Sequence, residues 1–191
     1  AGKVLANELR LKLGEEILRF IEEGGLILGI CNGFQVLVKA GFLPDPTKGS
    51  ASSVTLTNND SGKFECRWVH LEANRNSPCV FTQGVDRMYL PVAHGEGKLV
   101  ALPGLLAEVS IALRYIDEDG NNRARYPHNP NGSVDNIAGI CDDSGRIFGL
   151  MPHPERHLRG TQHPQWTRLG SKKYGDGFQV FRNAVKWARS L

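Results

Sequence analysis

The strongest constraint on the fold of this chain is a cysteine between glycines, placed where a short apolar run meets an amphipathic segment. The run covers residues 26–30, and its end overlaps the string Gly29-Ile30-Cys31-Asn32-Gly33. A run this short and this uniformly apolar suits a parallel strand buried on both faces, and residues 34–40 predict a helix ended by Gly41. A strand that turns into a helix at G-x-C-x-G is typical of a nucleophile elbow with cysteine in place of serine. The pattern therefore predicts an α/β protein.

The remaining pattern indicates two further helices and a series of short strands. In residues 4–23 apolar side chains recur every four positions until Gly24-Gly25, which favours an amphipathic helix, and residues 178–188 predict a closing helix. The apolar positions of the first helix are Leu5, Leu9, Leu13, Ile17 and Ile21, with Leu18 beside them. Strands are expected at 53–57, 64–71, 88–92, 111–116, 137–141 and 146–151. Hairpin turns are expected at Asp119-Gly120 and Asp143-Ser144-Gly145, and loops at 126–133 and 157–177.

Length and composition exclude several classes of protein. The 191 residues suit a single domain with one core. The net charge of +3, with acids and bases mixed, argues against a nucleic-acid surface, and no apolar run approaches the roughly 18 residues of a membrane span. Four cysteines without C-x-x-C spacing argue against structural zinc and against a disulfide framework. With no signal-peptide pattern at the start, we expect a cytoplasmic protein without a metal site.

Cys31 is the candidate nucleophile. We expect side chains at Gly29 and Gly33 to collide with the neighbouring strand and helix, which would explain both glycines. A helix that begins after Cys31 favours the thiolate and points backbone N–H groups toward an oxyanion. The alternative is a buried apolar cysteine beside a glycine turn.

A thiolate that attacks a carboxamide needs a proton carrier, most often histidine held by an acidic partner. His153 follows an apolar strand, so it should lie at the same sheet edge as Cys31, and Glu155 is close enough in sequence to orient its ring. An incidental ion pair in a surface turn is the alternative. His94 is the nearest rival, because it lies between a strand and a glycine-rich turn.

These residues carry a resemblance to a known family. The string Gly29-Ile30-Cys31-Asn32-Gly33-Phe34-Gln35, together with His153-Pro154-Glu155, resembles the signature of class I glutamine amidotransferases, with His153 placed 122 positions after Cys31. Further strings resemble the glutaminase subunits of phosphoribosylformylglycinamidine synthase: TNNDSGKFECR at 57–67, PVAHGEG at 91–97, NPNGS at 129–133, MPHPERH at 151–157, GDGF at 175–178 and FRNAV at 181–185. The resemblance spans the whole chain. It implies a flavodoxin-like parallel sheet with flanking helices and added antiparallel hairpins.

The resemblance also implies a function. A triad of Cys31, His153 and Glu155 would release ammonia from L-glutamine, with Asn32 and Gly33 at the oxyanion turn and Gln35 holding the substrate. His94 is a further candidate for substrate binding. The ammonia would pass to a synthetase subunit, accompanied by a small adapter subunit, that converts formylglycinamide ribonucleotide to formylglycinamidine ribonucleotide in purine biosynthesis. ATP and magnesium are expected on that partner, because this chain has no phosphate-binding loop and is expected to bind no cofactor.

One departure from the family leaves alternatives open. Family members carry further strands ahead of the segment that opens this chain, so residues 1–191 are expected to be one glutaminase domain without its N-terminal strands. A catalytically silent docking module is therefore an alternative, and so is a thiol hydrolase that acts alone.

Overall fold

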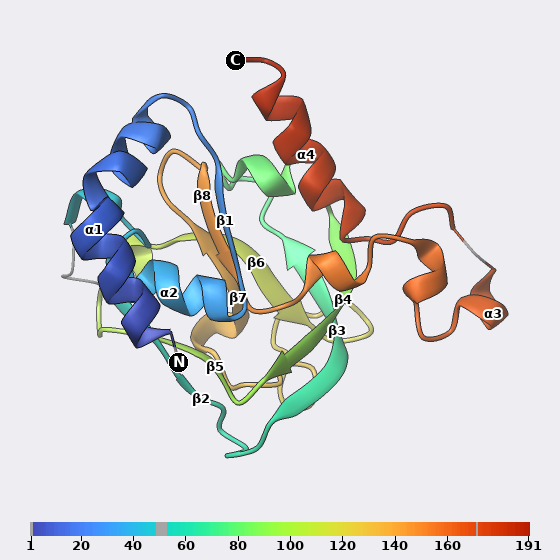
Figure 1. Cartoon of the computed structure of the whole chain (residues 1–191). Coiled ribbons are helices and arrows are strands. Elements are labelled where there is room, and N and C mark those ends of the chain that lie inside the picture. The colour runs from blue at the N-terminus through green and yellow to red at the C-terminus, as the bar shows by residue number, and fades with distance from the viewer. Residues whose placement is uncertain (1, 49–52, 171) are drawn as a thin grey trace.

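The computed structural model describes residues 2–48, 53–170 and 172–191. Six strands form one sheet in the order β1-β8-β7-β6-β3-β4, and β2 and β5 form a separate antiparallel pair (Figure 1). The strand bounds are β1 Ile27–Ile30, β2 Val54–Asn58, β3 Glu65–Ala73, β4 Arg87–His94, β5 Glu96–Ala101, β6 Ser110–Ile116, β7 Ile137–Cys141 and β8 Ile147–Leu150. Within the large sheet, β1 and β8 are parallel, and the other pairs are antiparallel.

The helices are α1 Lys3–Glu22, α2 Asn32–Ala40, α3 Trp166–Leu169 and α4 Phe178–Ala188. Short 3₁₀ turns occur at Pro46–Lys48, Val80–Thr82, Leu106–Glu108, Val134–Asn136, Pro154–Arg156 and Gly160–Gln162. The predicted α/β class is confirmed, and so are the three predicted helices. The parallel part of the sheet is the β1–β8 pair, and antiparallel hairpins extend it.

Most predicted strands are present, and the exceptions have physical causes. The strand β5 was not predicted, because Gly97 within it and Gly95 just before it weaken the strand pattern and its partner β2 is distant in the sequence. The turn at Asp143-Ser144-Gly145 joins antiparallel β7 and β8 as predicted. Asp119-Gly120 also turns, with the Gly120 N–H donating to the Asp117 carbonyl, but it lies inside a loop and joins no hairpin.

The predicted apolar face of α1 is only partly buried. Ala6 and Ile21 are buried, and Leu9 and Ile17 pack against the core, whereas Leu13 is exposed. A four-residue spacing advances by more than the 3.6 residues of one helical turn, so a long four-residue repeat winds around the helix. Its members therefore cannot all face the core.

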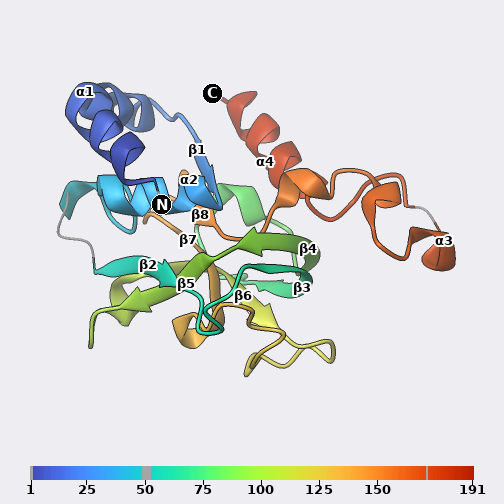
Figure 2. The ribbon, with the colours of Figure 1, turned by 60° about the horizontal axis from the view of Figure 1, so that its bottom comes forward.

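Helices cover both faces of the β1–β8 pair (Figure 2). Gly29 of β1 and Gly149 of β8 are register partners, and both lie beneath α2. A Cβ atom at Gly29 would be 2.5 Å from Leu37 Cδ1, and one at Gly149 would be 2.1 Å from Phe34 Cδ2. Phe148 points to the opposite core, which also contains Val180 of α4. The two glycines therefore let α2 approach the sheet closely.

The sheet curls until its last strand, β4, meets the carboxyl ends of β1 and β8. Three carbonyls on the free edge of β4 accept hydrogen bonds from outside the sheet. The Tyr89 carbonyl is 2.8 Å from His157 Nδ1, the Pro91 carbonyl accepts the His153 N–H at 2.8 Å, and the Ala93 carbonyl faces Cys31 Sγ at 3.8 Å. This closure brings residues from opposite ends of the sheet order together.

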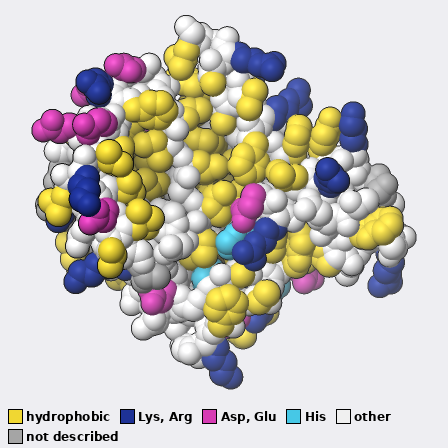
Figure 3. Space-filling view, viewed as in Figure 1, with side chains coloured by type: hydrophobic (Ala, Val, Ile, Leu, Met, Phe, Trp, Pro, Cys, Tyr) yellow, Lys and Arg dark blue, Asp and Glu magenta, His cyan; other side chains and the backbone are white. Residues whose placement is uncertain are grey.

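The other edge strand of the sheet, β1, differs from β4 in how its outer edge is covered. Among the described residues β1 pairs with β8 alone. Only Gly29 of β1 is fully buried, so the expectation of a strand buried on both faces is wrong; in the described ranges no strand pairs with the outer edge of β1. Apolar side chains are exposed on the adjoining surface near α1 and α4 (Figure 3). No helix in the described ranges is long and apolar enough to cross a membrane.

We expect substitution of Gly149 by Ala to destabilise the fold, because the added methyl group overlaps the Phe34 ring. Overpacking of this kind costs about 1–3 kcal/mol. Gly14→Ala in α1 is the matched control: nothing lies within 4 Å of its Cβ position, and the change should add about 0.5–1 kcal/mol. Urea unfolding of both variants measures the two effects. Equal stability of the two variants would show that α2 does not pack on Gly149 as described.

Candidate active site

The cysteine elbow has the strained backbone expected of such a turn. Cys31 immediately precedes α2 and has φ 52° and ψ −106°, a conformation that costs a non-glycine residue on the order of 1–3 kcal/mol. Gly29 is required beneath it, since a Cβ there would also lie 2.8 Å from the Gly33 carbonyl carbon. The same expectation for Gly33 is wrong, because nothing lies within 4 Å of its Cβ position.

Burial raises the pKa of the Cys31 thiol above its ordinary value. The Asn32 N–H at the start of α2 and the charge of Arg156 lower the pKa, whereas the Glu155 carboxylate raises it further. The helix N-terminus therefore acts in the expected direction, but burial outweighs it. The resting side chain is a thiol, so an adjacent base has to remove its proton.

His153 and Glu155 form the pair that the sequence predicts. His153 Nδ1 is 2.6 Å from Glu155 Oε1, and Arg156 Nε is 3.5 Å from the same carboxylate oxygen. A carboxylate without a proton only accepts hydrogen bonds, so Nδ1 carries the hydrogen and Nε2 presents a lone pair. The ring is buried, and Nε2 has no hydrogen-bond partner among the described residues. This is the tautomer that a general base needs.

The parallel strand pair brings Cys31 and His153 to one edge. The Cys31 N–H donates to the Leu150 carbonyl at 2.8 Å, which ties the elbow to the end of β8 just before His153. Sγ faces the Ala93 carbonyl rather than His153 Nε2, so the cysteine–histidine hydrogen bond is absent. Such bonds often form only once substrate is bound. In the view of Figure 3, histidine side chains lie near the centre of the surface, beside an acidic and a basic side chain.

Asn32 and Gln35 both lie on α2, directly after the elbow. The Asn32 N–H interacts with the Cys31 sulfur, and Asn32 is the first residue of α2. Gln35 is buried, and its side-chain Nε2 donates to the Glu96 carbonyl. Its amide therefore ties α2 to the first residue of β5, and its assignment as a glutamine ligand stays a prediction.

His94 lies at the end of β4 and is 4% exposed. Burial lowers its pKa, and the nearby His153 lowers it further, to about 4. The side chain is therefore neutral at pH 7. His153 is near enough for its charge to act on His94.

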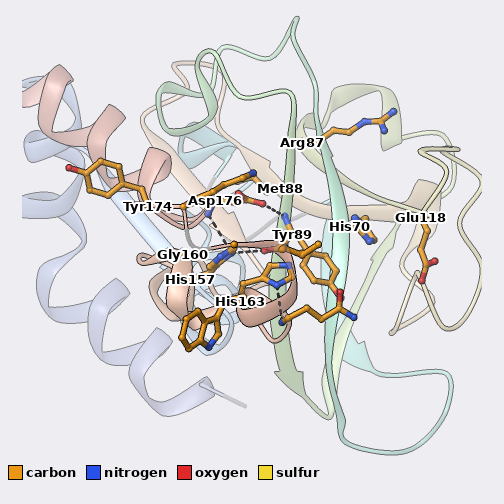
Figure 4. A pocket seen from close by; sticks show the side chains of 15 residues that line it. His70, Arg87, Met88, Tyr89, Glu118, His157, Gly160, His163, Tyr174 and Asp176 are labelled. Carbon is orange, nitrogen blue, oxygen red and sulfur yellow. Dashed lines mark hydrogen bonds between the residues drawn. The ribbon is translucent and has the colours of Figure 1, made fainter.

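The other histidines lie elsewhere. A cavity of about 610 Å³ beside the outer face of β3 and β4 is lined by His70, His157 and His163 together with Tyr89 (Figure 4). The Tyr89 and His163 rings are 5.3 Å apart. Neither Cys31, His153 nor Glu155 lines this cavity, so it adjoins the candidate site without containing it.

Three contributions to the site were missed by the sequence analysis. The carbonyls of Pro91 and Ala93 position His153 and Cys31, and Arg156 acts on the Cys31 thiol. Backbone carbonyls carry no sequence signal. A proline in the middle of a strand does carry one, since it indicates an edge strand.

Comparisons with known proteins show the family to which this chain belongs. A model of the CobB/CobQ-like glutamine amidotransferase domain matches residues 1–188, and the chain belongs to this family. A solved structure of PurLQS from Thermotoga maritima has a TM-score of 0.71 and 34% sequence identity, covering 98% of this chain and 72% of that one.

Two relatives indicate which group within the family this chain is similar to. A phosphoribosylformylglycinamidine synthase subunit PurQ from Dehalococcoides mccartyi is 60% identical over 191 residues, which cover 100% of this chain and 74% of the relative. The subunit PurQ from Methanococcus maripaludis strain S2 is 40% identical, covering 98% of this chain and 74% of the relative. The expected resemblance to these glutaminase subunits is thus confirmed.

We expect two electrophiles to label different cysteines. A small maleimide should modify Cys66 first, because Cys66 is exposed whereas Cys79 and Cys141 are buried and Cys31 is half-buried. A diazo-ketone analogue of glutamine should instead modify Cys31. Peptide mapping by mass spectrometry measures both distributions.

Arg156→Gln should slow the labelling of Cys31 by the analogue, because it removes a charge that lowers the pKa of the thiol. Arg159→Gln is the matched control, since Arg159 is not among the groups that act on this thiol. If the analogue modifies chiefly Cys66, Cys79 or Cys141, the assignment of the elbow is wrong.

The lowered pKa of His94 predicts a loss of stability in acid. The unfolded state takes up a proton near pH 6.5, whereas the folded state does so only near 4, so stability falls as the pH falls between these values. The difference corresponds to about 3 kcal/mol. Urea unfolding of the wild-type protein at pH 7 and pH 4 should show this extra loss relative to His94→Phe. An identical pH dependence in the two proteins would contradict the prediction.

Proposed function

We propose that this chain hydrolyses the side-chain amide of L-glutamine, with Cys31 as nucleophile, His153 as proton carrier and Glu155 as its orienting partner. The observation that carries the proposal is the 2.6 Å contact between His153 Nδ1 and Glu155 Oε1, held beside the cysteine elbow by the β1–β8 pair. Membership of the glutamine amidotransferase family supports it.

In the first half-reaction, His153 Nε2 takes the thiol proton of Cys31. The sulfur then bonds to the carboxamide carbon, and a negative charge develops on the carboxamide oxygen. The Asn32 N–H, which interacts with the sulfur in this structure, can donate to that oxygen. When the carbon–nitrogen bond breaks, the nitrogen takes the proton from His153 and leaves as ammonia.

In the second half-reaction, His153 removes a proton from water, whose oxygen attacks the γ-glutamyl thioester. The carbon–sulfur bond breaks, the proton returns to the sulfur, and glutamate is released. Glu155 stabilises the imidazolium that forms in both halves and keeps the proton on Nδ1.

The proposal extends to an assembly. Relatives named as subunits of phosphoribosylformylglycinamidine synthase, and the solved PurLQS structure, support a synthetase partner that receives the ammonia. That partner would use ATP and magnesium to convert formylglycinamide ribonucleotide to formylglycinamidine ribonucleotide, and a small adapter subunit would join it. The proposed setting is the cytoplasm.

Cys31→Ala should abolish glutamine-dependent synthesis by the assembled enzyme and leave ammonia-dependent synthesis intact, because only the nucleophile is removed. The rate with each nitrogen source measures this directly. Synthesis from glutamine at the wild-type rate would rule out Cys31 as the nucleophile.

The same assay compares how much His153 and Glu155 contribute to the glutamine-dependent rate. His153→Asn removes the proton carrier, whereas Glu155→Gln removes only its orienting partner, so the first variant should lose far more of the glutamine-dependent rate. Equal losses would indicate another base.

A further inference from the structure

His94 carries a buried nitrogen atom that the proposed triad does not use. Its Nε2 has no hydrogen-bond partner among the residues that the structure describes. A buried acceptor without a donor destabilises the fold, so native proteins rarely retain one without a function. His94 is the last residue of β4, and the carbonyl of the preceding residue, Ala93, faces Cys31 Sγ.

The hydrogen bonds of Asn59 fix which nitrogen of His94 carries the proton. Asn59 Nδ2 donates to the Lys63 carbonyl at 2.9 Å and to the His94 carbonyl at 2.8 Å. The amide orientation is thereby set, and Oδ1 is an acceptor. It accepts the Gly97 N–H at 3.1 Å and lies 3.1 Å from His94 Nδ1. Nδ1 therefore donates, and Nε2 can only accept.

The ring of His94 lies against Gly97. A Cβ atom at Gly97 would be 2.5 Å from both Cε1 and Nδ1 of His94 and 2.9 Å from Nε2. Gly97 thus leaves space for the imidazole face, while Asn59 holds its edge. A buried ring held on two sides is suited to present one lone pair in a fixed direction.

The end of β4, which carries His94, and the start of β5 contact the elbow and its helix. The Ala93 carbonyl lies 3.8 Å from Cys31 Sγ, and the Glu96 carbonyl accepts a hydrogen bond from the Gln35 side chain on α2. His153 is near enough to disfavour a proton on His94, which burial already disfavours. The imidazole is therefore neutral at pH 7.

We propose that His94 Nε2 accepts a hydrogen bond from the carboxamide NH₂ group of glutamine and so selects the amide over the carboxylate of glutamate. This inference rests on the proposed function. A carboxamide nitrogen has two hydrogens to donate, whereas a carboxylate has none and would direct lone pairs at a lone pair.

The proposed hydrogen bond to His94 Nε2 would also distinguish between the species that form later in the reaction. The departing nitrogen receives one proton from His153 and leaves as ammonia, which keeps N–H donors for His94. The glutamate formed when water cleaves the thioester has no donor for Nε2. His94 would therefore favour bound substrate and disfavour bound product, and it would be a substrate-binding residue that determines specificity.

The test compares two substrates in the assembled enzyme. Glutamine has the N–H donor, whereas the γ-methyl ester of glutamate reacts at the same carbon without one. His94→Phe should lower kcat/KM for glutamine by about tenfold, the effect of one hydrogen bond, leave the ester rate within about twofold, and strengthen inhibition by glutamate. His128→Phe, a half-buried histidine in a loop, is the control and should change neither rate. Equal losses on both substrates, or no loss on either, would overturn the proposal.

Cys31→Ala separates this inference from the proposed function. If that variant still hydrolyses both substrates, the triad is wrong whatever His94 does. If it loses both while His94→Phe does not discriminate between them, only the role of His94 fails.

A second measurement does not depend on folding of the His94 variant. In the Cys31→Ala protein, the ¹⁵N resonance of His94 Nε2 should be that of an unprotonated nitrogen, and it should shift when glutamine is added but not when glutamate is added. A protonated Nε2, or the same shift with both compounds, would also overturn the proposal.

Discussion

The free edge of β4 is the constraint on which the rest of the site depends. Its carbonyls at Tyr89, Pro91 and Ala93 accept from His157, His153 and Cys31, respectively. These contacts close a curled sheet over the carboxyl ends of its parallel strands. Without them, the elbow and the histidine would share an edge, but the end of β4, which carries His94, would not face either of them.

Burial keeps the Cys31 thiol and the His94 imidazole uncharged at rest. Burial raises the pKa of the Cys31 thiol and lowers that of His94, and the only carboxylate in the proposed triad is bound to His153. Catalysis in such a site depends on prearranged lone pairs and N–H groups rather than on a standing thiolate. The backbone strain at Cys31 and the glycine beneath it position the sulfur for this purpose.

The parts of the site that could be predicted from sequence are those encoded locally. A strand, a glycine-flanked cysteine and a helix follow one another within 15 residues (26–40), and His153 and Glu155 follow β8 directly. The curl of the sheet could not be predicted, because it depends on contacts between β4 and residues far away in the chain. The expectation at Gly33 failed because its Cβ position opens to free space, and that on α1 because a regular spacing does not show which part of a helix is covered.

Because of Pro91, the two edges of this sheet differ in how readily they can pair with a further strand. On β4 the Tyr89 N–H is bound by the Asp176 carboxylate, and Pro91 has no N–H to offer. An incoming strand would find few backbone groups there to pair with. Within the described part of the chain, β1 keeps an open outer edge. Any strand that joins this sheet, from the same chain or from another, is therefore directed to β1, and the sheet can be extended without displacing the hydrogen bonds of β4 that hold the histidines.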